Sequence, residues 1–305
     1  MNDFSPTQAP LVSVGIPVYN GERYLAQAIE SVLNQHYDRL EVIISDNAST
    51  DNTPDICQHY ARRDRRIRYT RNARNMGAAF NYNRLVDLAR APYFKWMAHD
   101  DVCAPTLIGS CLDVLEQEPA VALCYAPTTF IDKGGSPIRT IRDGFHFRDH
   151  RPSERFRRFL PLARGWMNPV FGVYRTDVLR QTQRIGSYPS SDMILIADIT
   201  LRGEVHELSE SLFFRREHQH MSVRANPSML ERQRWFDPTY RGRAPMVHWR
   251  WVAEFLRIIH RAPVALSEKA QCVLALTRWL KWTRRELVGE MIVAARHVPA
   301  FRGKR

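Results

Sequence analysis

The chain has 305 residues, a mass of 35.5 kDa and a formal net charge of +12. Its five cysteines form no CxxC pair and are odd in number, which excludes a disulfide framework. No signal peptide or membrane-spanning stretch is visible, so we expect a cytoplasmic protein with one large domain, residues 1–225, and a basic extension, residues 226–305.

The first predicted unit is a strand, a helix and a second strand. Leu11–Val18 and Leu40–Ser45 are short, β-branched apolar runs, which is typical of buried parallel strands. Between them, Glu22–Asn34 has apolar residues at helical spacing, with Asn20 as the expected N-cap. Because ligands bind at the carboxyl ends of such strands, the chain begins with half of a ligand site.

The second strand ends in Asp46, which can accept hydrogen bonds from a base or a ribose. No GxGxxG follows the first strand and no GxxxxGK[ST] occurs, so the dinucleotide fingerprint and the ATPase-type phosphate loop are both excluded. The alternative for Asp46 is a turn residue, since DNASTDNT is rich in turn formers. Within that run, Thr53 followed by Pro54 indicates a helix start.

A third predicted strand, Tyr93–Met97, leads into His99, Asp100 and Asp101. Adjacent carboxylates at a strand end suit Mg²⁺ or Mn²⁺, which prefers oxygen ligands and completes its shell with phosphate and water. The alternative is an exposed acidic loop that caps the next helix.

Four segments in this order resemble the family 2 glycosyltransferases: VSVGIPVYNGERYLAQAIESVLNQ, LEVIISDNASTDNT, RNARNMGAAFNYNR and YFKWMAHDD. The resemblance implies the α/β GT-A fold, a Rossmann-like, mostly parallel central sheet flanked by helices, here with a C-terminal helical extension. It also implies a nucleoside-diphosphate-sugar donor. The residues expected to bind that donor are Pro17, Tyr19, Asn20, Asp46, Asn75, Gly77, Asn83 and Asp100.

The family's metal motif is Asp-x-Asp followed by a further Asp, and here Ala98 replaces the first Asp. The resemblance therefore makes Asp100 the main ligand of a divalent cation, Mn²⁺ or Mg²⁺, with Asp101 as a ligand or support. Glu207–Phe214 is expected to be an edge strand, after which His218 would reach the metal or the diphosphate.

An inverting transferase needs a carboxylate that takes the proton from the acceptor hydroxyl. Asp192 is at the matching position, in the first turn of a predicted helix, where a plain capping role is the alternative. The expected activity is a single transfer to a glycan or lipid-linked acceptor, in surface polysaccharide or cell-envelope biosynthesis. Because Ala98 departs from the motif, an inactive nucleotide- or glycan-binding scaffold is the rival hypothesis.

The arginine-rich segment from Arg139 to Arg164 is either a solvated loop and helix or a lid with arginines on phosphate. Trp166 after it either stacks on a sugar or is a buried aromatic residue. Arg215 or Arg216 can also meet phosphate.

The last 80 residues hold 16 Lys and Arg against 6 Asp and Glu. Two basic amphipathic helices are predicted, Pro245–Arg261 and Ser267–His297, both containing Trp. They either bind the surface of an anionic membrane, as a peripheral protein would, or pack on the catalytic domain. No nucleic-acid-binding motif accompanies the charge, so we expect no nucleic-acid partner.

Overall fold

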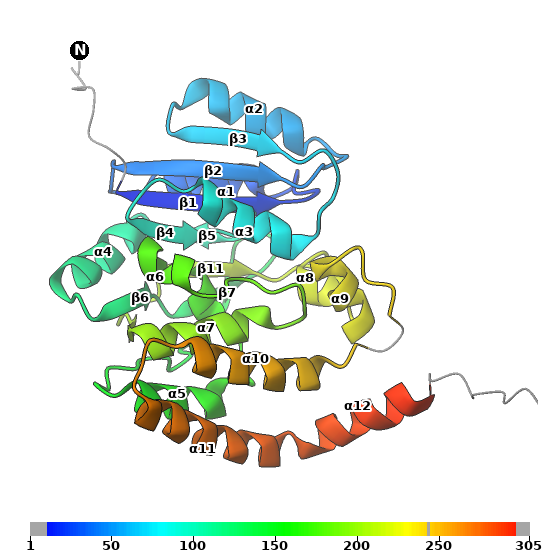
Figure 1. Ribbon diagram of the computed structural model, residues 1–305. Helices are drawn as coiled ribbons and strands as arrows, with labels where there is room; N and C mark the ends of the chain where they lie inside the picture. The colour runs from blue at the N-terminus through cyan, green and yellow to red at the C-terminus, as the bar shows by residue number, and fades with distance from the viewer. Residues whose placement is uncertain (1–10, 243–244, 297–305) are drawn as a thin grey trace, which may run out of the picture.

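The computed structural model describes residues 11–242 and 245–296, which are arranged around a seven-stranded sheet (Figure 1). Its strand order is β10-β6-β9-β4-β1-β2-β3. Only β9 runs antiparallel to its neighbours among these described strands. The bounds are β1 Val12–Val18, β2 Leu40–Asp46, β3 Ile67–Arg71, β4 Tyr93–Trp96, β6 Val121–Tyr125, β9 Val173–Arg175 and β10 Glu204–Glu207. The predicted mostly parallel sheet is confirmed.

A second sheet has the order β5-β11-β7-β8. The prediction of one edge strand over Glu207–Phe214 is wrong, because the chain ends β10 at Glu207 and starts β11 at Phe213 in this other sheet. β10 pairs with β6 in the large sheet, whereas β11 pairs with β7 in the second sheet. The two late strands therefore divide between the two sheets just as β6 and β7 do. The bounds are β5 Val102–Cys103, β7 Thr128–Ile131, β8 Pro137–Ile141 and β11 Phe213–Arg216.

Helices cover both faces of the large sheet, and each face has its own apolar core. On one face lie α1 Leu25–Leu33, α2 Thr53–Arg63 and α4 Leu107–Gln117. On the other lie α3 Ala78–Leu88, α5 Pro152–Leu162, α6 Thr176–Gln181 and α7 Ser191–Arg202. Side chains along β2 point alternately to the two faces, so Ile43 packs in one core while Val42 and Ile44 pack in the other. All five cysteines are buried and free.

The first helix starts later than its sequence pattern predicts. α1 begins at Leu25, and Asn20 is not its N-cap but a left-handed residue with φ of 52°. The amide N–H of Asn20 donates to Ser49 Oγ over 2.9 Å, and Asn20 Oδ1 accepts from Thr50 N over 2.9 Å. Asn20 therefore joins the end of β1 to the loop after β2, which brings two strand ends into one structure.

The C-terminal segment packs on the second face. After α8 Ser222–Ala225 and α9 Met229–Phe236 come α10 Val247–Arg261, α11 Leu266–Trp282 and α12 Arg284–Arg296. The single helix predicted from Ser267 is broken at Thr283, and its last predicted residue, His297, lies outside the described residues. Phe255 of α10 stacks edge-on against Phe156 of α5 and Trp279 of α11. α10 and α11 thus complete the core, while α12 extends away from the body (Figure 1).

No helix in the described ranges combines the length and the apolar character that crossing a bilayer requires.

Candidate active site

A cleft of about 770 Å³ lies at the carboxyl ends of β1 and β4, between the loops that follow the strands of the parallel sheet. Its size is in the range of small-ligand sites, about 300–1,000 Å³. The predicted residues that line it are Pro17, Tyr19, Asn20, Asn75, Asp100, Asp101 and His218. The structure therefore brings both ends of the predicted donor site into one cavity.

Asn47 is the residue that joins two of these loops, and the sequence prediction missed it. Its Oδ1 accepts from Met76 N and from Asn72 Nδ2, both over 2.9 Å. Its Nδ2 donates to Asn75 Oδ1 over 2.8 Å. Since Asn47 also lines the cleft, it fixes the shape of the wall that a nucleotide would touch. Asn47 directly follows the second predicted strand, and this position could have identified it as a residue of the ligand site.

Asp46 lies beneath the cleft, not on its surface. Its side chain is fully buried, and Oδ1 accepts from Ser49 N over 2.8 Å. Oδ2 accepts from the Tyr69 hydroxyl over 2.9 Å and forms an ion pair with Arg71 Nε over 3.2 Å. These contacts give Asp46 the turn-forming role that was its alternative, and direct contact with a base stays a prediction.

Gly77 and Asn83 also lie outside the lining of the cleft. Gly77 has φ of 85°, and a Cβ there would lie 2.5 Å from the carbonyl oxygen of Phe236, so the position requires glycine. Asn83 exchanges two hydrogen bonds with the backbone of Ile185, over 2.8 and 3.1 Å. Asn81 lines the cleft instead, because residues two apart on α3 do not share a face.

Asp100 and His218 form the acidic end of the cleft, with 2.8 Å between Asp100 Oδ2 and His218 Nε2. Asp101 is buried, and its Oδ1 accepts from the Arg216 N–H over 2.9 Å. His218 Nδ1 is buried and has no hydrogen-bond partner among the residues that the structure describes, and the centre of its ring lies 4.9 Å from that of Tyr24.

Within the described ranges, no group of three or more His, Cys, Asp or Glu is arranged to hold a metal. Asp100 and His218 nevertheless suit a cation that takes its remaining ligands from phosphate and water.

The two adjacent carboxylates have opposite electrostatic environments. Burial alone would raise the pKa of Asp100, but His99, His218 and Arg215 outweigh it and hold this pKa below its usual range. Burial and the charge of Asp100 raise the pKa of Asp101. Of the two carboxylates, Asp100 therefore has the lower pKa, and it is also the one whose oxygen faces His218.

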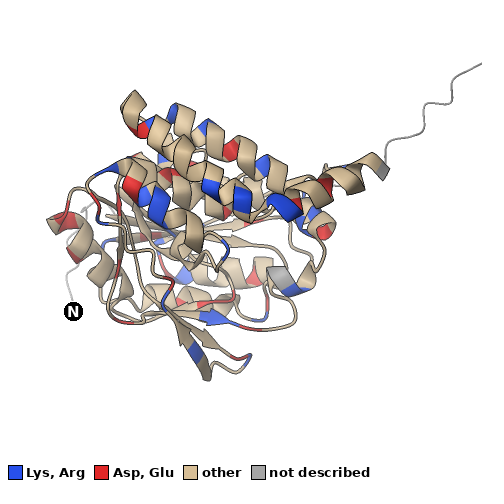
Figure 2. Ribbon diagram, turned by 90° about the horizontal axis from the view of Figure 1, so that it is seen from below, with Lys and Arg blue, Asp and Glu red and all other residues tan. Residues whose placement is uncertain are grey.

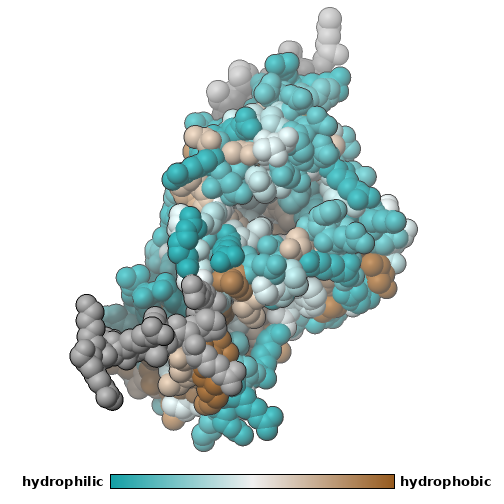
Figure 3. All heavy atoms as spheres, turned by 90° about the vertical axis from the view of Figure 1, so that its right-hand side faces the viewer, coloured by the Kyte–Doolittle hydropathy of each residue, from teal (hydrophilic) through white to brown (hydrophobic). Residues whose placement is uncertain are grey.

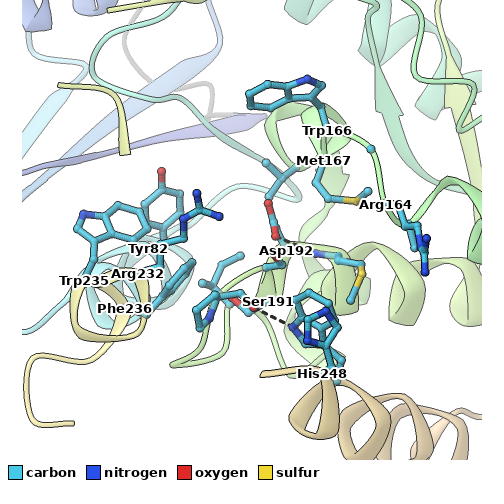
Figure 4. A pocket seen from close by; sticks show the side chains of 18 of the residues that line it. Tyr82, Arg164, Trp166, Met167, Ser191, Asp192, Arg232, Trp235, Phe236 and His248 are labelled. Atoms are coloured by element: carbon cyan, nitrogen blue, oxygen red, sulfur yellow. Dashed lines mark hydrogen bonds between the residues drawn. The ribbon is translucent and has the colours of Figure 1, made fainter. Parts of the chain in front are cut away.

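A second cavity, of about 440 Å³, lies next to the first and is walled by aromatic side chains. Figure 4 shows Asp192 near its centre, with Trp166 on one side and Trp235 and Phe236 on another. The wall comes from segments far apart in the sequence: the loop after α5, the start of α7, α9, α10, α11 and α12. The aromatic residues of the lining are Tyr82, Trp166, Phe171, Trp235, Phe236, Trp251 and Trp279.

Asp192 lies in the first turn of α7, as predicted, and its Oδ1 accepts from Met193 N over 3.0 Å. Burial raises the pKa of Asp192, against the opposing effects of the Met193 N–H and Arg215. A carboxylate with a raised pKa is a stronger proton acceptor when ionised. Beside it, the buried hydroxyl of Ser191 has no hydrogen-bond partner among the described residues.

Four side chains line both cavities and so form their junction: Tyr82, Phe171, Arg215 and Trp235. Burial raises the pKa of Tyr82, and the charges of Asp100 and Asp192 act in the same direction. Both carboxylates therefore lie near this one ring, which places the acidic end of the cleft close to the predicted base.

Arg215, not Arg216, is the cation at this junction. Its Nη1 donates to Asn168 Oδ1 over 2.8 Å, and its guanidinium lies 4.7 Å from the centre of the Trp166 ring. Asn168 in turn donates to both carboxylate oxygens of Asp143 over 3.1 Å. Arg216 is 3% exposed and its donors are used by backbone carbonyls and by a glutamine. Trp166 itself is half-buried and lines the second cavity, so its stacking on a sugar stays a prediction.

The arginine-rich segment is mostly tied into the body. Arg148 pairs with Glu204, Arg151 pairs with Glu268 of α11, and Arg155 donates to the carbonyl of Thr200. Arg164 differs, because it lines the second cavity. These contacts favour a structural role over the lid for most of the segment.

The chain is similar to known proteins both in sequence and in structure. The sequence profile described as "Glycosyl transferase family 2" matches residues 13–182. Chondroitin synthase of Escherichia coli is 35% identical over 131 residues, which is 43% of this chain and 19% of that protein. The matched segments span from about a fifth to about a half of the length of these curated relatives.

Two solved structures show the same fold. S. aureus TarS in complex with UDP-GlcNAc has a TM-score of 0.64 at 14% identity, covering 92% of this chain and 79% of that one. A mannosyltransferase from Pyrobaculum calidifontis, in complex with GDP-Man and Mn²⁺, has a TM-score of 0.51 at 16% identity, covering 94% and 87%. The likeness confirms the predicted GT-A fold.

Proposed function

Because the chain belongs to glycosyl transferase family 2, we propose that it moves a sugar from a nucleoside-diphosphate donor to an acceptor hydroxyl. The observation that carries this proposal is the meeting of two cavities at Tyr82 and Arg215. One cavity holds Asp100 and His218, and the other holds Asp192. A transferase needs such an arrangement, with the leaving group on one side of the sugar and the attacking hydroxyl on the other.

The first cavity is the proposed donor site. Pro17, Tyr19 and Asn47 would surround the base and ribose, and the acidic end would receive the diphosphate. TarS binds UDP-GlcNAc and the P. calidifontis enzyme binds GDP-Man with Mn²⁺, which supports a nucleotide-sugar donor here. Asp100 and His218 would hold a divalent cation, and that ion would neutralise negative charge on the diphosphate.

Asp192 is the proposed base of an inverting displacement. It takes the proton from the acceptor hydroxyl as that oxygen bonds to the anomeric carbon. The bond from this carbon to the diphosphate oxygen breaks on the opposite face, and the electron pair leaves with the nucleoside diphosphate. Arg215 lies between the two sites and offers its positive charge to the departing phosphate.

The second cavity is the proposed acceptor site. Its aromatic wall suits the apolar face of a sugar ring, and its volume of about 440 Å³ is in the range of small-ligand sites. We expect a single transfer to a glycan or lipid-linked acceptor of the cell envelope, on the cytoplasmic side of the membrane.

A screen of nucleotide sugars with Mn²⁺ or Mg²⁺ tests the proposal. Released nucleoside diphosphate, measured by a coupled assay, is expected with one donor or a few related ones. Asp100→Ala should abolish this release, whereas Asp192→Asn should keep donor binding and lose transfer. Release that is unchanged in Asp100→Ala would contradict the assigned donor site.

The rival hypothesis is an inactive scaffold that binds a nucleotide or a glycan. Ala98, which replaces the first Asp of the metal motif, favours it. Donor binding by calorimetry, without hydrolysis or transfer over the whole panel of donors and acceptors, would support the scaffold.

A further inference from the structure

The outer surface of α11 and α12 combines exposed apolar side chains with unpaired positive charge. We call it the α11–α12 face. Its apolar residues are each between 50% and 58% exposed: Leu274, Trp282, Val288, Met291 and Ile292. Its basic residues are exposed beside them: Arg278, Lys281, Arg284 and Arg285. In Figure 2, Lys and Arg positions gather where the two helices meet.

The acidic residues of both helices are turned to other partners. Glu268 pairs with Arg151 over 2.9 Å, Glu286 lies 3.7 Å from Arg164, and Glu290 pairs with His248 over 2.8 Å. The four basic residues of the face form no ion pair with any other described residue. The face is therefore positive as well as apolar, although the two helices contain both signs of charge.

We propose that the α11–α12 face binds the surface of an anionic lipid bilayer. Scattered half-exposed apolar side chains with interleaved arginine and lysine are typical of helices that lie in a membrane interface. Trp282 is in the middle of the face, and tryptophan favours the headgroup level. Apolar surface also gathers at the lower end of the molecule in Figure 3, near the last described residues.

The position of the face gives this binding a consequence for the reaction. The Trp282 carbonyl accepts a hydrogen bond from Arg164 over 2.7 Å, and Thr283 and Glu286 line the second cavity. The junction of α11 and α12 thus belongs to the face and to the cavity wall at once. A protein bound through this face holds the second cavity next to the bilayer, where an acceptor anchored by a lipid would be presented. This last step rests on the proposed function, whereas the binding itself does not.

Vesicle sedimentation with the full-length chain tests the proposal. The protein should pellet with vesicles of phosphatidylcholine containing roughly one-third phosphatidylglycerol, and much less with phosphatidylcholine alone. Reversing three charges in Arg278→Glu/Lys281→Glu/Arg285→Glu should lower the partition coefficient at least about 100-fold. Met291→Ser/Ile292→Ser should lower it about tenfold by removing apolar contact.

The matched control reverses three exposed arginines at the far end of the molecule, Arg62, Arg63 and Arg65 on and after α2. It should bind as the unchanged chain does, and so should Asp192→Asn, which separates membrane binding from catalysis.

Failure of the chain to pellet, or equal loss in the control, would overturn the proposal. A concentration-dependent dimer that Met291→Ser/Ile292→Ser dissociates would do the same, since a second copy would then cover the face. So would strong binding to single-stranded RNA that ignores the apolar substitutions.

Discussion

The two cavities differ in how the chain builds them. The first cavity, the proposed donor site, takes most of its lining from residues 17–101, where each strand ends at the same edge of the sheet. The second cavity, the proposed acceptor site, is assembled from segments spread over residues 82–286, including four separate C-terminal helices. A site made at strand ends follows from the local order of strands and helices, whereas a site made between helices depends on how distant segments pack.

The largest expected effect on the rate comes from replacing Asp192, the proposed catalytic base in the second cavity. Asp192→Asn keeps the size of the side chain but cannot take a proton, so kcat should fall about 10²- to 10⁴-fold. The Michaelis constant for the donor should change little, because Asp192 lines only the second of the two cavities. Steady-state kinetics with both substrates measure the two constants.

Asp177→Asn is the matched control, since Asp177 is the first-turn acid of α6 and is exposed. A loss of activity equal to that of Asp192→Asn would mean that first-turn acids act here only by stabilising helices.

The next effect concerns stability and tests whether the C-terminal helices are part of the body. Phe255 is fully buried between α5 and α11, so Phe255→Ala should lower the free energy of unfolding by about 3–5 kcal/mol. Leu256 is its neighbour on α10 and is 45% exposed, so Leu256→Ala should cost about 0.5 kcal/mol or less. Chemical denaturation of both variants gives the comparison. Equal midpoints would mean that α10 is only loosely attached.

The difference between a site at strand ends and a site between helices also explains what the sequence could predict. The parallel sheet, the acidic loop at Asp100 and the helix start at Asp192 follow from apolar runs and helical spacing, and the structure confirms their positions. The family resemblance predicts Asn83 in the donor site, but on this helix Asn81 lines the cleft and Asn83 bonds to the backbone of Ile185 instead.

The aromatic wall of the acceptor cavity was beyond this reasoning. Trp251 and Trp279 lie at helical spacing in amphipathic segments, which predicts only that they face something apolar. Which segment they face is decided by tertiary packing between α7, α10 and α11, and no local pattern encodes it.

Arg215 offers a test of the junction between the two cavities. Arg215→Ala should lower kcat/KM about 10- to 100-fold, since a hydrogen bond to a charged group contributes about 1.5–3 kcal/mol. Arg215→Lys keeps the charge but cannot hold both Asn168 and a phosphate, so it should recover only part of the loss. Full recovery by lysine would show that Arg215 acts by charge alone.

Smaller effects are expected on substrate binding, with one variant changing acceptor binding and the other changing donor binding. Trp166→Ala should raise the Michaelis constant of the acceptor a few-fold, up to about tenfold, because aromatic contacts are worth about 0.5–1.5 kcal/mol. Asn47→Ala should instead weaken donor binding, since it releases the loop that holds Asn75. Binding of the nucleoside diphosphate by calorimetry and acceptor titrations distinguish them. Variants that change both constants equally would contradict two separable sites.

The smallest expected effect is a shift in the pH dependence of kcat/KM, which would connect Arg215 at the junction of the two cavities to Asp192, the proposed base. Asp192 must be ionised to accept a proton, so kcat/KM should fall as the pH drops through its pKa. Burial raises this pKa, which places the acidic limb of the profile at a higher pH than an ordinary aspartate would give.

The positive charge of Arg215 opposes the effect of burial by stabilising the ionised form. Removing that charge in Arg215→Gln should therefore raise the pKa of Asp192 further and move the acidic limb to still higher pH. Arg215→Lys, which keeps the charge, should leave the limb in place although it lowers the rate. A limb that stays fixed in Arg215→Gln would show that another group titrates, and the base would then have to be sought elsewhere in the acceptor cavity.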